Sequence, residues 1–258
     1  RYRLSEPTFR PWDTLSEEER ADEIRKMEVY AAMIDRLDQN IGRLIQLLEG
    51  RGELENTLIL FLSDNGASAE VVPPEGLQAH DPDAPIGGIA RWVSLGPDWA
   101  NVSNTPFRYY KNYSYEGGIN TPFIAWWPGV IDKGAITSFP AHIIDIMPTL
   151  VESSGATYPR RFNGAPVTAM KGVSLMPVFR GEQVEREGTL FWKWRHGEAV
   201  RRSNWKLVRH GEDAPWQLFD LVGDPTETRD LAPRLPGVVE SLARAHSRWL
   251  METETPAQ

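Results

Sequence analysis

Hydrophobic residues recur in steps of three and four along residues 24–48, and this spacing predicts one long amphipathic helix with a buried face. The apolar positions are Ile24, Met27, Ala31, Ile34, Leu37, Ile41, Leu44 and Leu48. Ser16 followed by Glu19 has the form of a capping box, which places the start of the helix just after Ser16. Gly50 and Gly52 supply a stop at the other end.

Two short apolar runs predict strands. The run TLILFL (57–62) is apolar on both alternating faces, as expected for a strand that is covered on both sides in a parallel sheet. A helix followed by such a strand forms an α/β unit. A second strand, 122–127 (PFIAWW), follows a turn at 116–118 (EGG), and a helix is expected over 145–153.

The pattern changes after about residue 180. Four short stretches separated by turns predict an antiparallel meander: 189–194, 198–202, 205–210 and 216–221. A terminal helix is expected over 237–251. Between the first strand and the second, residues 67–105 are rich in Pro and Gly, and we interpret them as a long loop of the kind that often carries function.

Composition and charge matter mainly through the classes they exclude. The net charge of −8 disfavours non-specific binding of nucleic acid. No apolar run approaches the roughly 18 residues that span a bilayer. The chain has no cysteine, which removes disulfides, thiolate metal sites and cysteine nucleophiles. Arg1 opens the chain without a signal-peptide pattern, and we expect a soluble protein of the bacterial cytoplasm or periplasm, between which the sequence does not decide.

Candidate ligands for a metal directly follow the first predicted strand. Asp64 and Asn65 lie at its carboxyl end, where ligands bind in open α/β sheets. A carboxylate beside a carboxamide offers hard oxygen donors of the kind that Ca²⁺ and Mg²⁺ prefer. Asp64-Asn65-Gly66 is also a common turn, because Asn and Gly tolerate a positive φ. These residues alone leave both interpretations open.

A second candidate is Lys111, which lies in the aromatic run FRYYKNYSYEGG (107–118) before the second strand. A lysine there can neutralise an oxyanion, or it can be a solvated loop lysine whose stem packs on tyrosines. His142, just ahead of a predicted helix, is interpreted as a packed or capping residue rather than a base.

Several segments, taken in order, resemble the C-terminal half of the type I sulfatases, in the alkaline-phosphatase-like superfamily. They are FLSDNGA (61–67), YYKNYSYEGGINTPFIAWWPGVI (109–131), HIIDIMPTLVESSGA (142–156), GVSLMPVFRGE (172–182) and WQLFDLVGDPTETRDLA (216–232). The bacterial arylsulfatase branch is the most similar, through GPDWANVSNTPFRYYK (96–111). The resemblance implies part of a sandwich with a mainly parallel sheet at residues 1–180, and a small antiparallel subdomain with a terminal helix at 181–258.

The resemblance also implies roles for single residues. Asp64 and Asn65 match two ligands of the family's divalent cation, usually Ca²⁺, and Lys111 matches the lysine that contacts the sulfate ester. In such enzymes a formylglycine hydrate attacks sulfur and the alcohol leaves. The implied substrate is a small sulfate ester or a sulfated glycan.

The chain departs from the family pattern in one important way. Formylglycine arises within a C/S-x-P-x-R motif in the N-terminal half of these enzymes, together with an early Asp-Asp metal pair, and this sequence lacks that half. We therefore expect the chain alone to be inactive and to need the N-terminal half as its partner. Two alternatives stay open: a phosphonate or phosphodiester hydrolase of the same superfamily, and a non-catalytic binding module that retains the fold.

Overall fold

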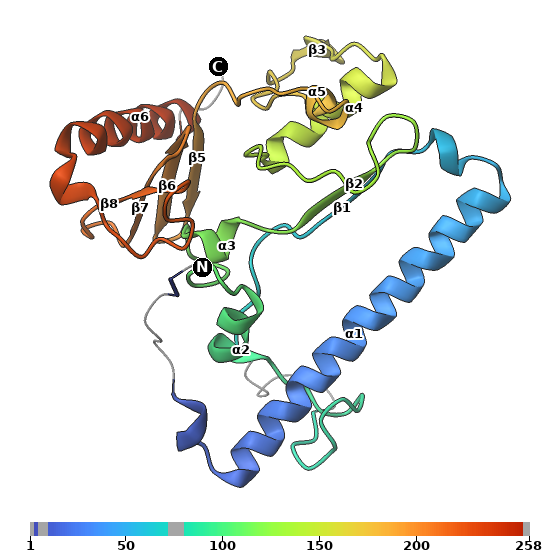
Figure 1. Ribbon diagram of the computed structural model, residues 1–258, viewed down its shortest axis with the longest axis vertical. Helices are drawn as coiled ribbons and strands as arrows, with labels where there is room; N and C mark the ends of the chain where they lie inside the picture. The colour runs from blue at the N-terminus through green and yellow to red at the C-terminus, as the bar shows by residue number, and fades with distance from the viewer. Residues whose placement is uncertain (1–2, 5–9, 72–79, 255–258) are drawn as a thin grey trace. The chain divides into compact units, whose positions relative to one another are not determined.

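The computed structural model describes residues 3–4, 10–71 and 80–254 (Figure 1). The chain divides into two compact units. The first, here called the meander unit, contains residues 1–47, 65–121 and 191–258. The second, the ribbon unit, contains residues 48–64 and 122–190.

The predicted long helix is present as α1 (Glu17–Gly50). Its capping box is formed as predicted, because the backbone N–H of Glu19 donates to Ser16 Oγ at 3.1 Å and the N–H of Ser16 donates to the Glu19 carboxylate at 2.8 Å. The described residues do not bury its predicted apolar face, since Ile34, Leu37 and Leu44 are 49%, 45% and 54% exposed. The expectation of a buried face is therefore not met by the residues that the structure describes.

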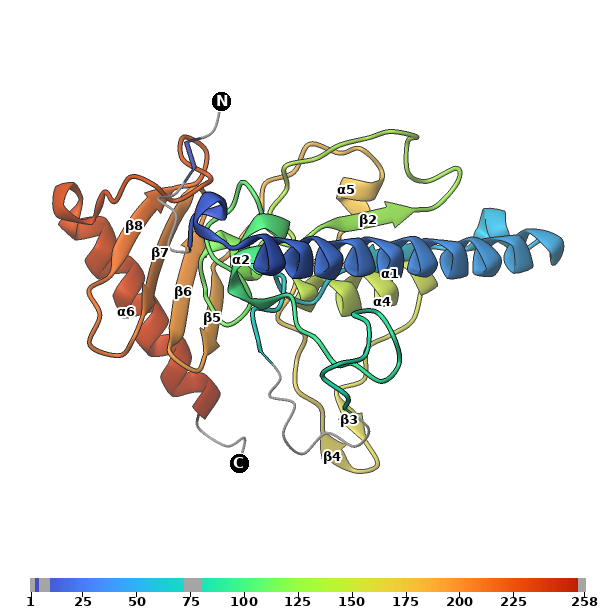
Figure 2. The same ribbon diagram turned by 90° about the horizontal axis from the view of Figure 1, so that it is seen from below.

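The C-terminal part of the meander unit confirms the predicted meander and terminal helix. Strands β5 (Leu190–Trp194), β6 (Gly197–Arg202), β7 (Trp205–His210) and β8 (Gln217–Asp220) form one sheet in chain order (Figure 2). Helix α6 (Pro236–Glu254) lies against one face of this sheet. Leu242 of α6 packs with Val200, Leu207 and Leu218 from the strands, so one hydrophobic core holds helix and sheet together.

The ribbon unit corrects the prediction of a mainly parallel sheet. Strand β1 (Ile59–Leu62) pairs antiparallel with β2 (Phe123–Trp126), and no two strands pair in parallel in the described part of the chain. Helix α5 (Met176–Phe179) covers one face of this pair, where Leu60 and Ala125 lie opposite each other. On the other face Phe61, Ile124 and Trp126 remain exposed. Strand β1 is apolar on both faces, but the described residues cover only one of them.

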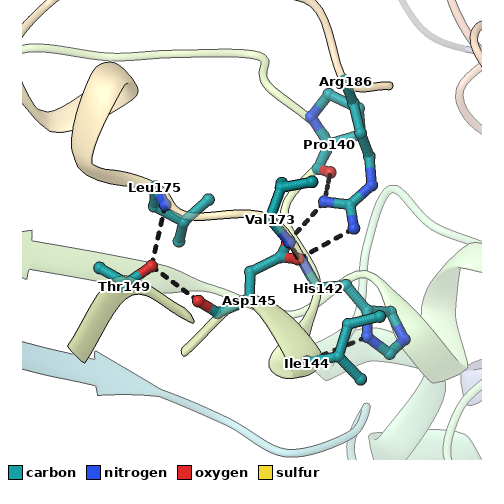
Figure 3. A network of polar contacts seen from close by, with 8 residues as sticks. All are labelled: Pro140, His142, Ile144, Asp145, Thr149, Val173, Leu175 and Arg186. Atoms are coloured by element: carbon teal, nitrogen blue, oxygen red, sulfur yellow. Dashed lines mark hydrogen bonds and ion pairs between the residues drawn. The ribbon is translucent and has the colours of Figure 1, made fainter. Parts of the chain in front are cut away.

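Helix α4 (Ile146–Ser154) ends as predicted at Gly155, which has a φ of 66°. Its entry is built around Asp145, whose carboxylate accepts the backbone N–H groups of His142 and Val173 at 2.8 and 2.9 Å (Figure 3). His142 Nδ1 in turn accepts the N–H of Ile144 at 3.2 Å. His142 is therefore a capping residue, as predicted, and burial lowers its pKa.

The remaining elements are short. They are α2 (Gly96–Ser103), α3 (Glu116–Ile119), the pair β3 (Arg161–Phe162) and β4 (Ala165–Pro166), and the 3₁₀ turns Trp12–Thr14, Leu54–Asn56, Ile143–Asp145 and Ala232–Arg234. Helix α2 interrupts the predicted loop 67–105, of which residues 72–79 lie outside the described residues. Among the described residues, no helix combines the length and apolarity that crossing a bilayer requires.

Candidate functional site

The predicted metal ligands lie directly beyond strand β1. Asp64 is exposed and is the last residue of its segment of the ribbon unit, and Asn65 is half-buried and opens the next segment of the meander unit. No group of three or more His, Cys, Asp or Glu side chains that could hold a metal occurs among the residues described. The oxygen donors of Asp64 and Asn65 suit a hard cation, but they are fewer than such an ion requires.

The segment after Asn65 is joined to the loop that carries Lys111 through the backbone. The N–H of Lys111 donates to the carbonyl of Ala67 at 3.0 Å, and the N–H of Gly66 donates to the carbonyl of Gly118 at 2.9 Å. The structure therefore brings together, within the meander unit, the two chain segments that the sequence singled out.

Asn104 forms a third link between these segments, and sequence reasoning did not identify it. Its Oδ1 accepts the N–H of Ala67 at 3.1 Å, and its Nδ2 donates to the carbonyl of Tyr109 at 3.0 Å. A carboxamide can make both bonds at once because it carries an acceptor and a donor. Its signal in the sequence is weak, since an Asn after a helix is an ordinary helix end.

Three glycines allow the close approach of these backbones. A Cβ on Gly66 would lie 1.8 Å from the carbonyl oxygen of Gly117, and a Cβ on Gly117 or Gly118 would meet backbone oxygens at 2.2 or 2.0 Å. Neither Asn65 nor Gly66 has a positive φ. The turn interpretation of Asp64-Asn65-Gly66 assumed a positive φ, and this assumption is wrong. A glycine is needed at position 66 because the backbone of Gly117 packs too closely to admit a Cβ.

Substitution of Gly66 by alanine is expected to destabilise the chain by about 1–3 kcal/mol or more, because backbone atoms must move to admit the methyl group. Urea unfolding of the chain, followed by circular dichroism, measures this change. Gly42→Ala is the matched control, since a Cβ at Gly42 in α1 meets nothing within 4 Å and alanine favours a helix by about 1 kcal/mol. Equal effects of the two substitutions would contradict the close-packing role of Gly66.

The side chain of Lys111 is two-thirds buried, and its ammonium pairs with Glu70 at 3.0 Å. This hydrogen bond, with the positive charge, lowers the pKa of Glu70. Tyr109 and Asn112, on either side of Lys111, both have left-handed backbones, with φ of 63° and 78°. Such a conformation is unfavourable for residues other than Gly and tends to occur at functional sites. Lys111 is thus held in a specific loop conformation and not in a freely solvated one.

Aromatic side chains line the same loop. The rings of Tyr109 and Tyr113 stack with centroids 4.4 Å apart, and the guanidinium of Arg108 lies 4.8 Å above the ring of Tyr109. Burial raises the pKa of Tyr115 to about 12, although the charge of Arg108 opposes this shift. Tyr115 is therefore a neutral donor at physiological pH, and its hydroxyl donates to Gln217 of β8.

Comparison with known proteins places these segments in a family. The sulfatase family model matches residues 2–156, more than half of the chain, and the model of the C-terminal region of N-sulphoglucosamine sulphohydrolase matches residues 107–245. An uncharacterised sulfatase of Schizosaccharomyces pombe is 33% identical over 95% of this chain and 46% of its own length. The arylsulfatase of Klebsiella aerogenes is 37% identical over 69% of this chain and 40% of its own.

Solved structures show the same fold. The crystal structure of Ps i-CgsB in complex with k-i-k-neocarrahexaose has a TM-score of 0.65 at 22% identity, over 92% of this chain and 44% of that one. The phosphonate monoester hydrolase of Silicibacter pomeroyi has a TM-score of 0.52 at 23% identity, over 84% of this chain and 38% of that one. The chain spans less than half the length of each of these proteins. Because the family model covers more than half of it, the chain belongs to the sulfatase family.

Proposed function

We propose that this chain supplies part of the active site of an enzyme that hydrolyses sulfate esters. The observation that carries the proposal is the backbone junction between the segment after Asn65 and residues 108–118, here called the Lys111 loop. It joins the backbone next to Asn65 to the loop that carries Lys111, and an amide oxygen and an ammonium are the groups that a counter-cation and a sulfate ester need. Lys111 would contact the sulfate oxygens and stabilise the charge that develops on them.

Asp64 and Asn65 would hold a divalent cation, most simply Ca²⁺, together with ligands from outside the chain. Their carboxylate and amide oxygens match the donor preference of that ion. When bound, the cation would orient sulfate oxygens and act as a Lewis acid. The nucleophile, a formylglycine in the family, would also come from outside the chain. The chain's own contribution is then to bind and orient the sulfate group.

An upstream half of the same protein is the partner that we propose. The chain covers 46% and 40% of its sulfatase relatives. It also leaves apolar surfaces exposed: Phe61, Ile124 and Trp126 on the ribbon, and Met33 and Leu44 on α1. Large apolar side chains on one face of an element indicate a covering partner. We call this chain together with that half the complete sulfatase, with residues 1–180 in its α/β catalytic domain and 181–258 in a C-terminal subdomain.

A sulfate ester is the substrate class that we propose, as a small aryl sulfate or a sulfated glycan. The arylsulfatase relative is named for the first class, and Ps i-CgsB was solved with a neocarrahexaose. A phosphonate or phosphodiester hydrolase is the second candidate, favoured by the likeness to a phosphonate monoester hydrolase. A lysine and a hard cation serve either tetrahedral anion.

The complete sulfatase is expected to hydrolyse 4-nitrophenyl sulfate faster than bis(4-nitrophenyl) phosphate or phenyl phosphonate esters, and the 258-residue chain alone is expected to hydrolyse none of them. Chelation of divalent cations should lower the rate, and Ca²⁺ should restore it. Faster turnover of the phosphorus esters would favour the second candidate. Absence of any turnover in the complete protein would favour a non-catalytic binding module.

A further inference from the structure

Three charged side chains are buried together at the C-terminal end of the Lys111 loop. Lys206 of β7 is fully buried, and Glu227, which follows β8, is fully buried as well. Glu116, the first residue of α3, is 5% exposed. The Lys206 ammonium lies 2.6 Å from Glu116 Oε1 and 2.8 Å from Glu227 Oε1. Burial of a lysine is costly unless carboxylates compensate its charge, so the three side chains must be placed as a set.

This cluster is tied to the backbone of the loop. The N–H of Glu116 donates to Glu227 Oε2 at 2.7 Å, and Asn120 Nδ2 donates to Glu116 Oε2 at 2.9 Å. Glu116 is followed by the tightly packed Gly117 and Gly118, and the carbonyl of Gly118 accepts the N–H of Gly66. A shift of Glu116 would therefore move both the Lys111 loop and its junction with the segment after Asn65.

The charges of the cluster do not cancel, because two carboxylates face one ammonium. Burial raises the pKa of Glu227 to about 7, with the Glu116 carboxylate acting in the same direction and Lys206 opposing it. Arg108 is a further charged residue beside Glu227 and donates to its backbone carbonyl at 3.3 Å. The N–H of Glu227 donates to the backbone carbonyl of Asp224 at 3.2 Å. The folded cluster thus favours a proton on Glu227, and loses stability as the pH rises through about 7.

We propose that Lys206 is a positioning residue of the enzyme: it holds Glu116 and Glu227, and through them it sets the position of the Lys111 loop without contacting the substrate. This inference rests on the proposed function of Lys111. Its consequence is that the C-terminal meander, which contains none of the predicted site residues, controls the conformation of the loop that does.

A second buried carboxylate provides a matched control. Glu198 of β6 is 3% exposed and pairs with Lys193 and with Arg209, at 2.7 Å from Arg209 Nη2. It lies in the same sheet as Lys206, and none of these partners belongs to the Lys111 loop. Glu198→Gln therefore disturbs a buried ion cluster of the same sheet whose charged members, Lys193, Arg209 and His246, all lie outside residues 108–118.

Hydrogen exchange of the 258-residue chain tests the proposal. In Lys206→Met at pH 8 we expect protection factors in residues 108–118 to fall by roughly a hundredfold, because the two buried carboxylates lose the ammonium that pairs with both of them. At about pH 5.5 the protection should return in large part, since the Glu227 carboxyl, whose pKa burial raises to about 7, can then be neutral. Glu198→Gln should leave protection of 108–118 at the wild-type value at both pH values.

A milder substitution decides the case if Lys206→Met does not fold. Wild-type protection of 108–118 should decrease between about pH 6 and pH 8 as Glu227 loses its proton, and Glu227→Gln should abolish this decrease. The proposal is overturned if Lys206→Met leaves the protection of residues 108–118 unchanged. It is also overturned if Glu198→Gln lowers that protection as much as Lys206→Met does.

The complete sulfatase provides a separate measurement. There we expect kcat/KM for 4-nitrophenyl sulfate to fall in a step near pH 7 as Glu227 loses its proton. Glu227→Gln should flatten this step, whereas Glu198→Gln should leave it in place. An unchanged step in Glu227→Gln would count against the positioning role. If the exchange effects are found but no sulfate ester is hydrolysed, the proposed function fails while the hold of Lys206 on the loop stands.

Discussion

Replacement of Lys111 by alanine is expected to lower kcat/KM of the complete sulfatase for 4-nitrophenyl sulfate by about two to three orders of magnitude. The physical reason is electrostatic. The ammonium is two-thirds buried and is held by a loop with left-handed residues on both sides, so it is oriented before substrate binds. Loss of one oriented donor to a developing oxyanion typically costs about 3–4 kcal/mol of transition-state stabilisation. Steady-state kinetics at saturating metal measures the change.

Lys133→Ala is the matched control, because Lys133 is an exposed lysine of the ribbon unit. It should leave kcat/KM unchanged. Lys111→Ala also leaves Glu70 without the ammonium partner that the structure shows, so Lys111→Ala/Glu70→Gln separates loss of the cation from exposure of an unpaired carboxylate. If the single variant retains wild-type rates, Lys111 does not contact the sulfate ester.

The second large effect is expected on stability, from Asp145→Ala. Asp145 is completely buried, and its carboxylate binds Arg186 through two nitrogens at 2.5 and 2.9 Å (Figure 3). It also accepts two backbone N–H groups. Its removal leaves a nearly buried guanidinium without its counter-charge, which typically costs about 3–5 kcal/mol. Denaturant unfolding of the 258-residue chain measures the loss.

Two comparisons sharpen this expectation. The exposed pair Arg180–Glu152, at 3.3 Å, is the matched control, and Glu152→Gln should cost about 0–1 kcal/mol. The double substitution Asp145→Ala/Arg186→Leu should recover part of the loss, since no uncompensated charge then remains buried. If Asp145→Ala costs no more than Glu152→Gln, the ion pair does not stabilise the entry to α4.

Local signals in the sequence predicted the local structure well. The capping box at Ser16 and the glycine at 155 fixed helix ends that the structure confirms. Both devices involve residues a few positions apart, so the sequence contains all the groups that take part. The four strands of the meander followed from short stretches separated by turns of a few residues, for the same reason.

Non-local arrangements could not be predicted in the same way. The apolar pattern of residues 57–62 indicates that both faces of the strand avoid water, but not what covers them or in which direction the neighbouring strand runs. Lys206 carries no local signal at all, because its partners lie at positions 116 and 227. The Lys111 loop itself was found in the sequence, whereas the groups that hold it were visible only in the structure.

The distance along the chain between Glu116 and its partners also bears on how the protein is made. Because a ribosome releases the chain from the N-terminus, the Lys111 loop emerges well before Lys206 and Glu227 are synthesised. Until then Glu116 has no buried cation to meet, and closing contacts over such long separations is slow. The loop proposed to bind sulfate thus reaches its final, ion-paired form only after the chain has been synthesised as far as Glu227.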